Sequence, residues 1–224
     1  MESSTLTKKN NWLDKLVLNK WFWTVFCLFF FCYPLYRSMN RELPQELPIY
    51  STLPDYKLID ENGKPFGSNQ LKGRVYIAAF HFTRCPSICP KLMENLQQIQ
   101  KRIKGVGQAA AIVAYTVDPE TDTPKVLFNK ARELNANPYV WKFLTGKKNE
   151  LSNLLIDGFK VPMGEAKPVE KNMYDISHAG KLVLVDGAGK IRGYYSTDRV
   201  SIDKLMIDLG LLINRSNMKY RKES

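Results

Sequence analysis

Two cysteines, Cys85 and Cys89, are the residues of this chain best suited to chemistry. They lie four positions apart in the stretch FTRCPSICP, residues 82–90. An apolar run typical of a buried strand precedes this stretch and a helical pattern follows it, and sites in α/β proteins form at such strand ends. With Cys89 in the first helical turn, both sulfurs face the same side with Cα atoms about 6 Å apart, within range of a disulfide or of one shared metal ion.

The surroundings of this pair favour the thiolate form of the cysteines. A helix N-terminus and the adjacent Arg84 both stabilise negative charge on sulfur. The thiolate is the form that binds metals and attacks disulfides, so the pair indicates metal binding or thiol–disulfide exchange. Two buried, inert cysteines are the alternative. The other two cysteines, Cys27 and Cys32, lie in an apolar run and are interpreted as apolar fillers.

A third ligand is needed, because two thiolates do not complete a metal site. The chain has two histidines, and His178 is the better candidate because it follows a long irregular segment and precedes the strand pattern KLVLV. Two cysteines with one histidine suit copper, since Cu(I) accepts three soft or borderline ligands. A loop histidine bonded to the backbone is the competing interpretation of His178. We expect His81, inside the apolar run, to be packed in the core. Met163 and Met173 are soft enough to help bind Cu(I), but Met is a common core filler and we expect core residues here.

The elements around these residues alternate between strand and helix. Residues 56–66 predict a hairpin with Asn-Gly in its turn. Buried strands are predicted at 73–82, 109–117, 141–144, 181–185 and 191–195, and helices at 90–104, 124–134, 148–156 and 201–213 with Ser201 as the last cap. The order predicts a three-layer α/β fold. Residues 158–177 show little periodicity and predict a long, functional or mobile loop.

An uncharged, aromatic run at residues 21–36 predicts an uncleaved membrane anchor over 21–37. A cleaved signal peptide is disfavoured, because bulky residues stand where small ones should precede the cut. Lysines before the run, at positions 8, 9, 15 and 20, outnumber the basic residues just after it. The positive-inside rule then places the N-terminus inside and the domain outside. The predicted parts are residues 1–20 inside, the anchor 21–37, a linker 38–51, the domain 52–213 and a basic tail 214–224.

The net charge of +11 divides unevenly, with +2 in residues 1–50, +6 in 51–213 and +3 in 214–224. The basic residues of the domain are scattered and no nucleic-acid motif accompanies them, so no nucleic-acid partner is predicted. A basic surface of this kind suits an anionic membrane or an acidic partner. With only two histidines, a His-rich metal enzyme is excluded.

Four stretches together resemble the Sco/SenC family of membrane-anchored, thioredoxin-like copper proteins. They are DENGKPF at 60–66, FTRCPSICP at 82–90, VDPETDTP at 117–124 and SHAGKLVLVDGAGK at 177–190. The resemblance covers residues 50–213 and implies a thioredoxin fold, with Cys85, Cys89 and His178 as copper ligands. It also implies delivery of copper to the binuclear copper A centre of cytochrome c oxidase subunit II, at the periplasmic or intermembrane-space side of an inner membrane.

Two departures from the family pattern concern charge. Ser87 stands between the cysteines and Ser177 before the histidine, where family members often carry acids. Their absence weakens attraction for Cu(II), so Cu(I) is the expected form and Cu(II) stays open. Asp118 and Asp122 match the family's third stretch, and we expect them to bond turns rather than metal.

Three functions stay open from the sequence. The chain is interpreted first as a copper metallochaperone whose partners include a copper donor or a thiol reductant. The second interpretation is an enzyme, a thiol–disulfide oxidoreductase that uses Cys85 and Cys89 as a redox-active disulfide and does not need His178. The third is a docking module for oxidase assembly, in which the cysteines would be dispensable.

Overall fold

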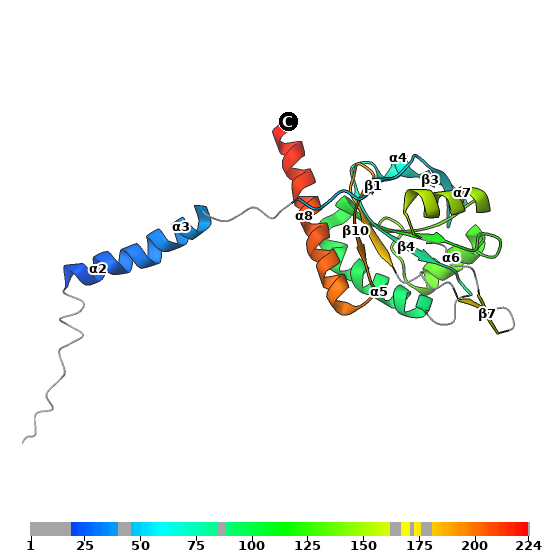
Figure 1. Cartoon of the computed structure of the whole chain (residues 1–224), viewed down its shortest axis with the longest axis horizontal. Coiled ribbons are helices and arrows are strands. Elements are labelled where there is room, and N and C mark those ends of the chain that lie inside the picture. The colour runs from blue at the N-terminus through cyan, green and yellow to red at the C-terminus, as the bar shows by residue number, and fades with distance from the viewer. Residues whose placement is uncertain are drawn as a thin grey trace, which may run out of the picture. The chain divides into compact units, whose positions relative to one another are not determined.

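The computed structural model describes residues 19–39, 46–84, 88–161, 167–170, 173–175 and 181–223. The chain divides into two compact units, residues 1–45 and residues 46–224. Figure 1 shows the elements of both, and each unit is described by itself.

The N-terminal unit is helical and aromatic. It consists of α2 (Lys20–Cys27), the π-helical segment η1 (Leu28–Cys32) and α3 (Tyr33–Met39). The side chain of Asn19 caps α2 by accepting a hydrogen bond of 3.0 Å from the backbone N–H of Trp21. The sequence predicts a membrane-spanning helix over 21–37; among the residues that the structure describes, no helix combines the length and apolar character needed to cross a bilayer.

The second unit is built on one eight-stranded sheet. Its strands are β1 (Ser51–Thr52), β2 (Lys57–Asp60), β3 (Pro65–Gly67), β4 (Val75–His81), β5 (Ala110–Thr116), β6 (Trp141–Thr145), β9 (Leu182–Val185) and β10 (Lys190–Tyr195). They lie in the order β1-β10-β9-β4-β5-β6-β2-β3. The centre, β4-β5-β6, is parallel, and β9 joins β4 in the antiparallel sense. Every residue of β4 and β5 is buried, as expected for central strands that are covered on both faces.

Helices cover both faces of the sheet and produce the predicted three layers (Figure 1). One core joins alternate residues of β4 and β5 to α5 (Ile88–Ile103), α6 (Pro124–Glu133) and α8 (Arg199–Glu223). The other core joins the opposite residues of the same strands to α4 (Ser68–Leu71), α7 (Lys148–Asn153) and the π-helical η3 (Leu154–Gly158). A short 3₁₀ segment, η2 (Lys104–Ala109), links α5 to β5. The sequence-based fold class of the domain is confirmed.

Two sequence-based expectations are corrected. The segment predicted as a long loop, 158–177, contains the hairpin β7 (Lys167–Glu170) and β8 (Met173–Asp175). Strands this short are held by pairing with each other and leave no periodic pattern to detect. The last helix begins at Arg199 rather than Ser201, because the carboxylate of Asp198 accepts a hydrogen bond of 3.0 Å from the N–H of Ser201 and caps the helix. This helix extends to Glu223, beyond the predicted end at residue 213.

The start of α6 agrees with its sequence signal and allows a modest prediction. Thr123 has an extended backbone and its hydroxyl oxygen accepts from the N–H of Val126 at 3.5 Å, with Pro124 in the first helical position. Thr123→Ala should lower the free energy of unfolding by about 1 kcal/mol, and Thr123→Ser should retain most of the cap. Urea denaturation measures both, and equal losses in the two variants would contradict the capping role.

Candidate metal centre

A buried carboxylate fixes the chain just after β4. Asp122 has no exposed surface. It accepts a hydrogen bond of 3.1 Å from the backbone N–H of Thr83, a second from the Thr83 hydroxyl, and a third of 2.5 Å from the hydroxyl of Thr116 at the end of β5. Because a buried carboxylate is stable only when its oxygens are satisfied, this network holds Thr83 against the end of the neighbouring strand.

A second carboxylate from the same turn holds the next residue. Arg84 donates from Nη2 to Oδ2 of Asp118 at 2.8 Å, and the N–H of Asp118 donates to the Thr116 hydroxyl at 3.0 Å. Burial raises the pKa of Asp118, but hydrogen bonds from Arg84 and Thr121 outweigh it and hold this pKa below its ordinary value. Both aspartates therefore bond turns, as the sequence predicts. The positive charge of Arg84 is shared with Asp118, so less of it acts on nearby groups than the sequence indicates.

The three expected ligands fall at the edge of what is described. Cys85 and His178 lie outside the described residues, and so do Met163 and the side chain of Met173. Cys89 is the second residue of α5, which agrees with its predicted place in the first helical turn, but its side chain is not described. Within the described part of the chain, no three His, Cys, Asp or Glu side chains gather as a metal-binding group.

The strand register shows where the chain leaves and re-enters the sheet around the expected ligands. β4 and β9 are neighbours, with Ala79 opposite Leu182. β4 continues two residues further, to His81, and Cys85 follows four residues later. β9 begins at Leu182, and His178 precedes it by four residues. The end of β4 and the start of β9 therefore lie at the same edge of the sheet, and both segments are attached there. Four residues of chain reach at most about 14 Å from that edge.

His81 lies in the core, as expected. It is 1% exposed, and its ring meets the Phe143 ring edge to face with centroids 5.5 Å apart. Burial lowers the pKa of His81 to about 4, although the nearby Asp122 carboxylate opposes the shift. The imidazole is therefore neutral at pH 7 and packs against an aromatic ring.

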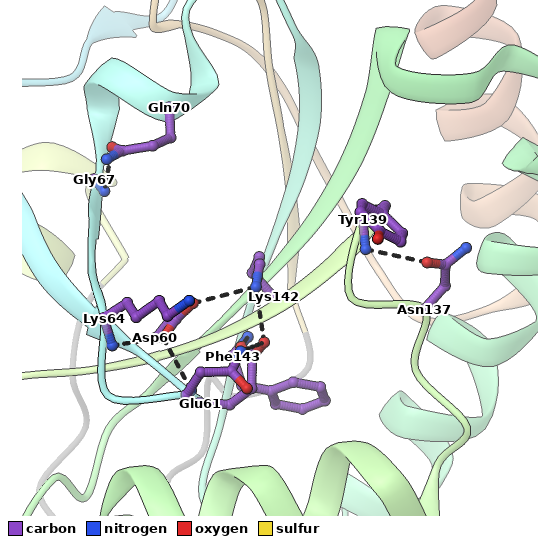
Figure 2. Close-up of polar contacts among 10 residues, drawn as sticks. Asp60, Glu61, Lys64, Gly67, Gln70, Asn137, Tyr139, Lys142 and Phe143 are labelled. Carbon is purple, nitrogen blue, oxygen red and sulfur yellow. Dashed lines mark hydrogen bonds and ion pairs between the residues drawn. The ribbon is translucent and has the colours of Figure 1, made fainter.

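The sequence reasoning missed the residues that hold the turn after β2. Lys142 on β6 donates to Oε1 of Glu61 at 2.9 Å and to Oδ2 of Asp60 at 3.2 Å (Figure 2). The other Glu61 oxygen accepts from the backbone N–H of Phe143 at 3.0 Å. This buried cluster, Asp60–Glu61–Lys142, joins the β2–β3 hairpin to the central sheet. Its acids were visible only as part of a turn motif, and nothing in the sequence pairs them with a lysine so far along the chain.

The parallel strands β4-β5-β6, the antiparallel β9 and β10, and a helix that starts at a C-x-x-x-C pair after β4 define a thioredoxin-like α/β protein. The particular family is given by sequence. The family model described as SCO1/SenC matches residues 45–213, and the chain belongs to this family.

Individual relatives agree with this assignment. A Stutzerimonas stutzeri protein named for copper binding is 32% identical over 149 residues, which are 66% of this chain and 71% of the relative. The crystal structure of a SCO1/SenC family lipoprotein from Bacillus anthracis is 26% identical, with a TM-score of 0.65 over 76% of this chain and 99% of the other. BsSco, described with a disulfide switch and as a member of a family of cytochrome c oxidase assembly proteins, is 26% identical, with a TM-score of 0.64 over 75% and 98%.

Proposed function

We propose that this protein is a copper metallochaperone that holds one copper ion with Cys85, Cys89 and His178. The observation that carries the proposal is the register of β4 and β9, which attaches the segments bearing these residues to adjacent strands at one edge of the sheet. The two carboxylate networks at Thr83 and Arg84 support it. Asp122 fixes the backbone at Thr83, and Asp118 holds the side chain of Arg84, the residue immediately before Cys85.

The donor set fits copper as cargo. Two thiolates and one imidazole are soft and borderline ligands, which Cu(I) accepts in three-coordinate form. Ser87 and Ser177 add no negative charge beside them, which favours Cu(I) over Cu(II). A Stutzerimonas stutzeri relative that is 32% identical is itself named for copper binding.

The client is proposed to be the binuclear copper A centre of cytochrome c oxidase subunit II. A three-coordinate ion leaves a position open to an incoming thiolate, so transfer can proceed by exchange of one ligand at a time. BsSco, which shares 26% identity with this chain, is described as a member of a family of cytochrome c oxidase assembly proteins. A copper donor would restore the loaded form, after a thiol reductant has converted any Cys85–Cys89 disulfide back to the dithiol.

Thiol–disulfide exchange is the second candidate, and the disulfide switch described for BsSco favours it. In this reaction the Cys85–Cys89 dithiol reduces a client disulfide. The chain gains a disulfide and loses two electrons and two protons, and the client gains both. Such a protein would be an oxidoreductase, and His178 would be dispensable to it.

Membrane attachment through the N-terminal unit completes the proposal. Its aromatic and apolar side chains lie open to solvent, with Trp21 79% and Phe31 70% exposed, and surfaces of this kind suit the membrane interface. The N-terminus would lie inside an inner membrane and the domain on its periplasmic or intermembrane-space side. Carbonate extraction of membranes and protease accessibility of the domain test attachment and side separately.

Copper stoichiometry tests the ligand set. The full-length chain in detergent, carrying Cys27→Ser and Cys32→Ser, is reduced and titrated anaerobically with Cu(I). These two free cysteines are exposed, so their removal leaves Cys85 and Cys89 as the only thiols. We expect one copper per chain, and loss of tight binding on adding either Cys85→Ser or His178→Ala, because each substitution removes one donor.

The other histidine, His81, supplies the control. His81→Phe keeps an aromatic ring in the core and should bind copper as the parent does. Binding that ignores His178, or no tight copper in the reduced parent, would overturn the three-ligand site. Retained exchange with a model disulfide in the His178→Ala variant would then favour the oxidoreductase.

A further inference from the structure

The helix α8 is longer than the surface it packs on. Among the side chains that the structure describes, up to residue 216, the last buried ones on α8 are Leu212 and Ile213. The helix continues to Glu223, and its final turns project beyond the sheet in Figure 1. Residues 214–223 add about 15 Å of helix. The SCO1/SenC family model ends at residue 213, so this extension lies outside the part of the chain that the family defines.

The extension is strongly basic. It carries Arg215, Lys219, Arg221 and Lys222 against one acid, Glu223. Positions 215, 219 and 222 follow the i, i+4, i+7 spacing and share one side of the helix. A helical segment this short gains little stability in water without a packing partner. Basic residues at these positions of such a helix indicate an interaction with a surface of opposite charge.

The extension begins beside Glu46, the first residue of the second unit. Arg215 pairs with Glu46 at 3.0 Å, and the neighbouring Leu47 carbonyl accepts from Arg192 of β10 at 2.6 Å. Only residues 40–45 separate Glu46 from Met39, the last residue of α3. The basic extension and the proposed membrane attachment are therefore joined to the same side of the domain.

That side is opposite the candidate metal centre. β1 follows Glu46 and pairs Ser51 with Ile191, Ile191 pairs with Val185, and Val185 pairs with Tyr76 near the start of β4. Cys85 follows the other end of β4. The strand β4 thus separates the edge that carries the linker and the basic extension from the edge that carries the expected copper ligands.

We propose that residues 214–223 of α8 bind the anionic headgroups of the membrane to which the N-terminal unit attaches, and hold the domain with its copper-binding edge turned away from that membrane. The inference rests on the proposed membrane attachment. Anionic lipid is the partner favoured here, because Arg215 pairs with Glu46 and only six residues of sequence, 40–45, join Glu46 to the proposed membrane-attached unit. Polybasic segments next to a membrane gain affinity with each Lys or Arg they present.

Hydrogen exchange on the full-length chain in lipid nanodiscs tests the proposal. One disc contains phosphatidylcholine alone and the other contains phosphatidylcholine with phosphatidylglycerol. We expect the amides of 214–223 to exchange at least about tenfold more slowly in the anionic disc, a difference that should fall when salt screens the charges. Lys219→Gln with Lys222→Gln should abolish most of this difference. The matched control, Lys91→Gln with Lys125→Gln, removes the same charge from the opposite end of the domain and should leave it unchanged.

The outcomes separate this inference from the proposal on which it rests. Co-elution of protein and disc reports attachment independently of exchange. A chain that stays on the disc with equal exchange in both lipids overturns the lipid assignment and leaves an acidic protein as the partner of these charges. Basic residues at a helix C-terminus also stabilise the helix dipole. Faster exchange of the lysine variant in both discs by the same factor would show that role alone and overturn the inference. A chain that leaves both discs overturns attachment and inference together.

Discussion

Replacing Lys142 with methionine is expected to lower the free energy of unfolding by about 3–5 kcal/mol. The side chains of Asp60 and Glu61 are 6% and 4% exposed, and Lys142 lies between them at 19% (Figure 2). Methionine fills a similar volume but carries no charge. Two neighbouring carboxylates would remain buried without their cation, which costs far more than the net contribution of the pairing itself.

The pH dependence of this loss follows from the two pKa shifts. Burial raises the pKa of Asp60, but hydrogen bonds from Lys64, Lys142 and Asn62 outweigh it and lower the pKa below 3.8. The stability from Asp60 is present above its unfolded pKa and is lost as the pH falls through the folded one. Burial lowers the pKa of Lys142, but Glu61 and Asp60 outweigh it and raise the pKa above 10.5. Its contribution is present below the unfolded pKa and is lost as the pH rises through the folded one.

Urea denaturation at a pH between the pKa values of Asp60 and Lys142 measures the loss of stability in Lys142→Met. A surface ion pair supplies the control. Lys148 and Glu120 lie 3.3 Å apart with side chains 66% and 72% exposed, so Lys148→Met should cost less than about 1 kcal/mol. Adding Asp60→Asn and Glu61→Gln to Lys142→Met should recover part of the loss, because no unpaired buried charge remains. Equal losses for Lys142→Met and Lys148→Met would contradict a stabilising role for the buried Asp60–Glu61–Lys142 cluster.

Replacing Asp122 with alanine is expected to cost a similar amount, about 3–5 kcal/mol. The substitution removes a fully buried acceptor and leaves three donors without a partner, namely the Thr83 N–H and the hydroxyls of Thr83 and Thr116. Unlike the Lys142 change, it also releases the backbone two residues before Cys85. We therefore expect weaker Cu(I) binding in the variant even under conditions where it is fully folded.

Three variants separate these effects. Thr116→Val keeps the volume and removes the hydroxyl that donates to Asp122 and accepts from the N–H of Asp118, so it should cost about 1–3 kcal/mol with little change in copper affinity. Asp118→Asn weakens a partly exposed pair with Arg84 and should cost less than Asp122→Ala. Circular dichroism and anaerobic copper titration on the same samples distinguish loss of fold from loss of site. A folded Asp122→Ala chain with unchanged Cu(I) affinity would limit Asp122 to a structural role.

The sequence predicted the domain fold well because its signals are local. The apolar runs that became β4 and β5, the Asn-Gly turn at 62–63 with Gly63 at a φ of 75°, and the Thr123-Pro124 start of α6 each depend on neighbouring residues only. The same reasoning placed Cys89 in the first turn of α5 and His81 in the core.

The features that escaped prediction depend on contacts between distant segments. Lys142 meets Asp60 and Glu61 only because β2 pairs with β6, and Asp122 meets Thr83 only because β4 pairs with β5. The strands β7 and β8 are too short to show a pattern, and residues 214–223 of α8 are largely polar and carry no apolar periodicity from which the end of the helix could be predicted. The ligand set rests on types and spacing in the sequence, and copper titration is its test.

The pairing of β4 with β9 has a consequence for how readily the proposed copper cargo can be released. Cys85 and His178 are about 90 residues apart in the chain, and closing a flexible loop of that length costs about 4 kcal/mol of chain entropy. In this fold the sheet closes that loop before any ion arrives, since Ala79 and Leu182 are already opposite each other. An ion that does not have to organise its own ligands is also not required for folding, so the protein can surrender it and remain intact. A zinc finger, which folds only around its metal, has no such freedom.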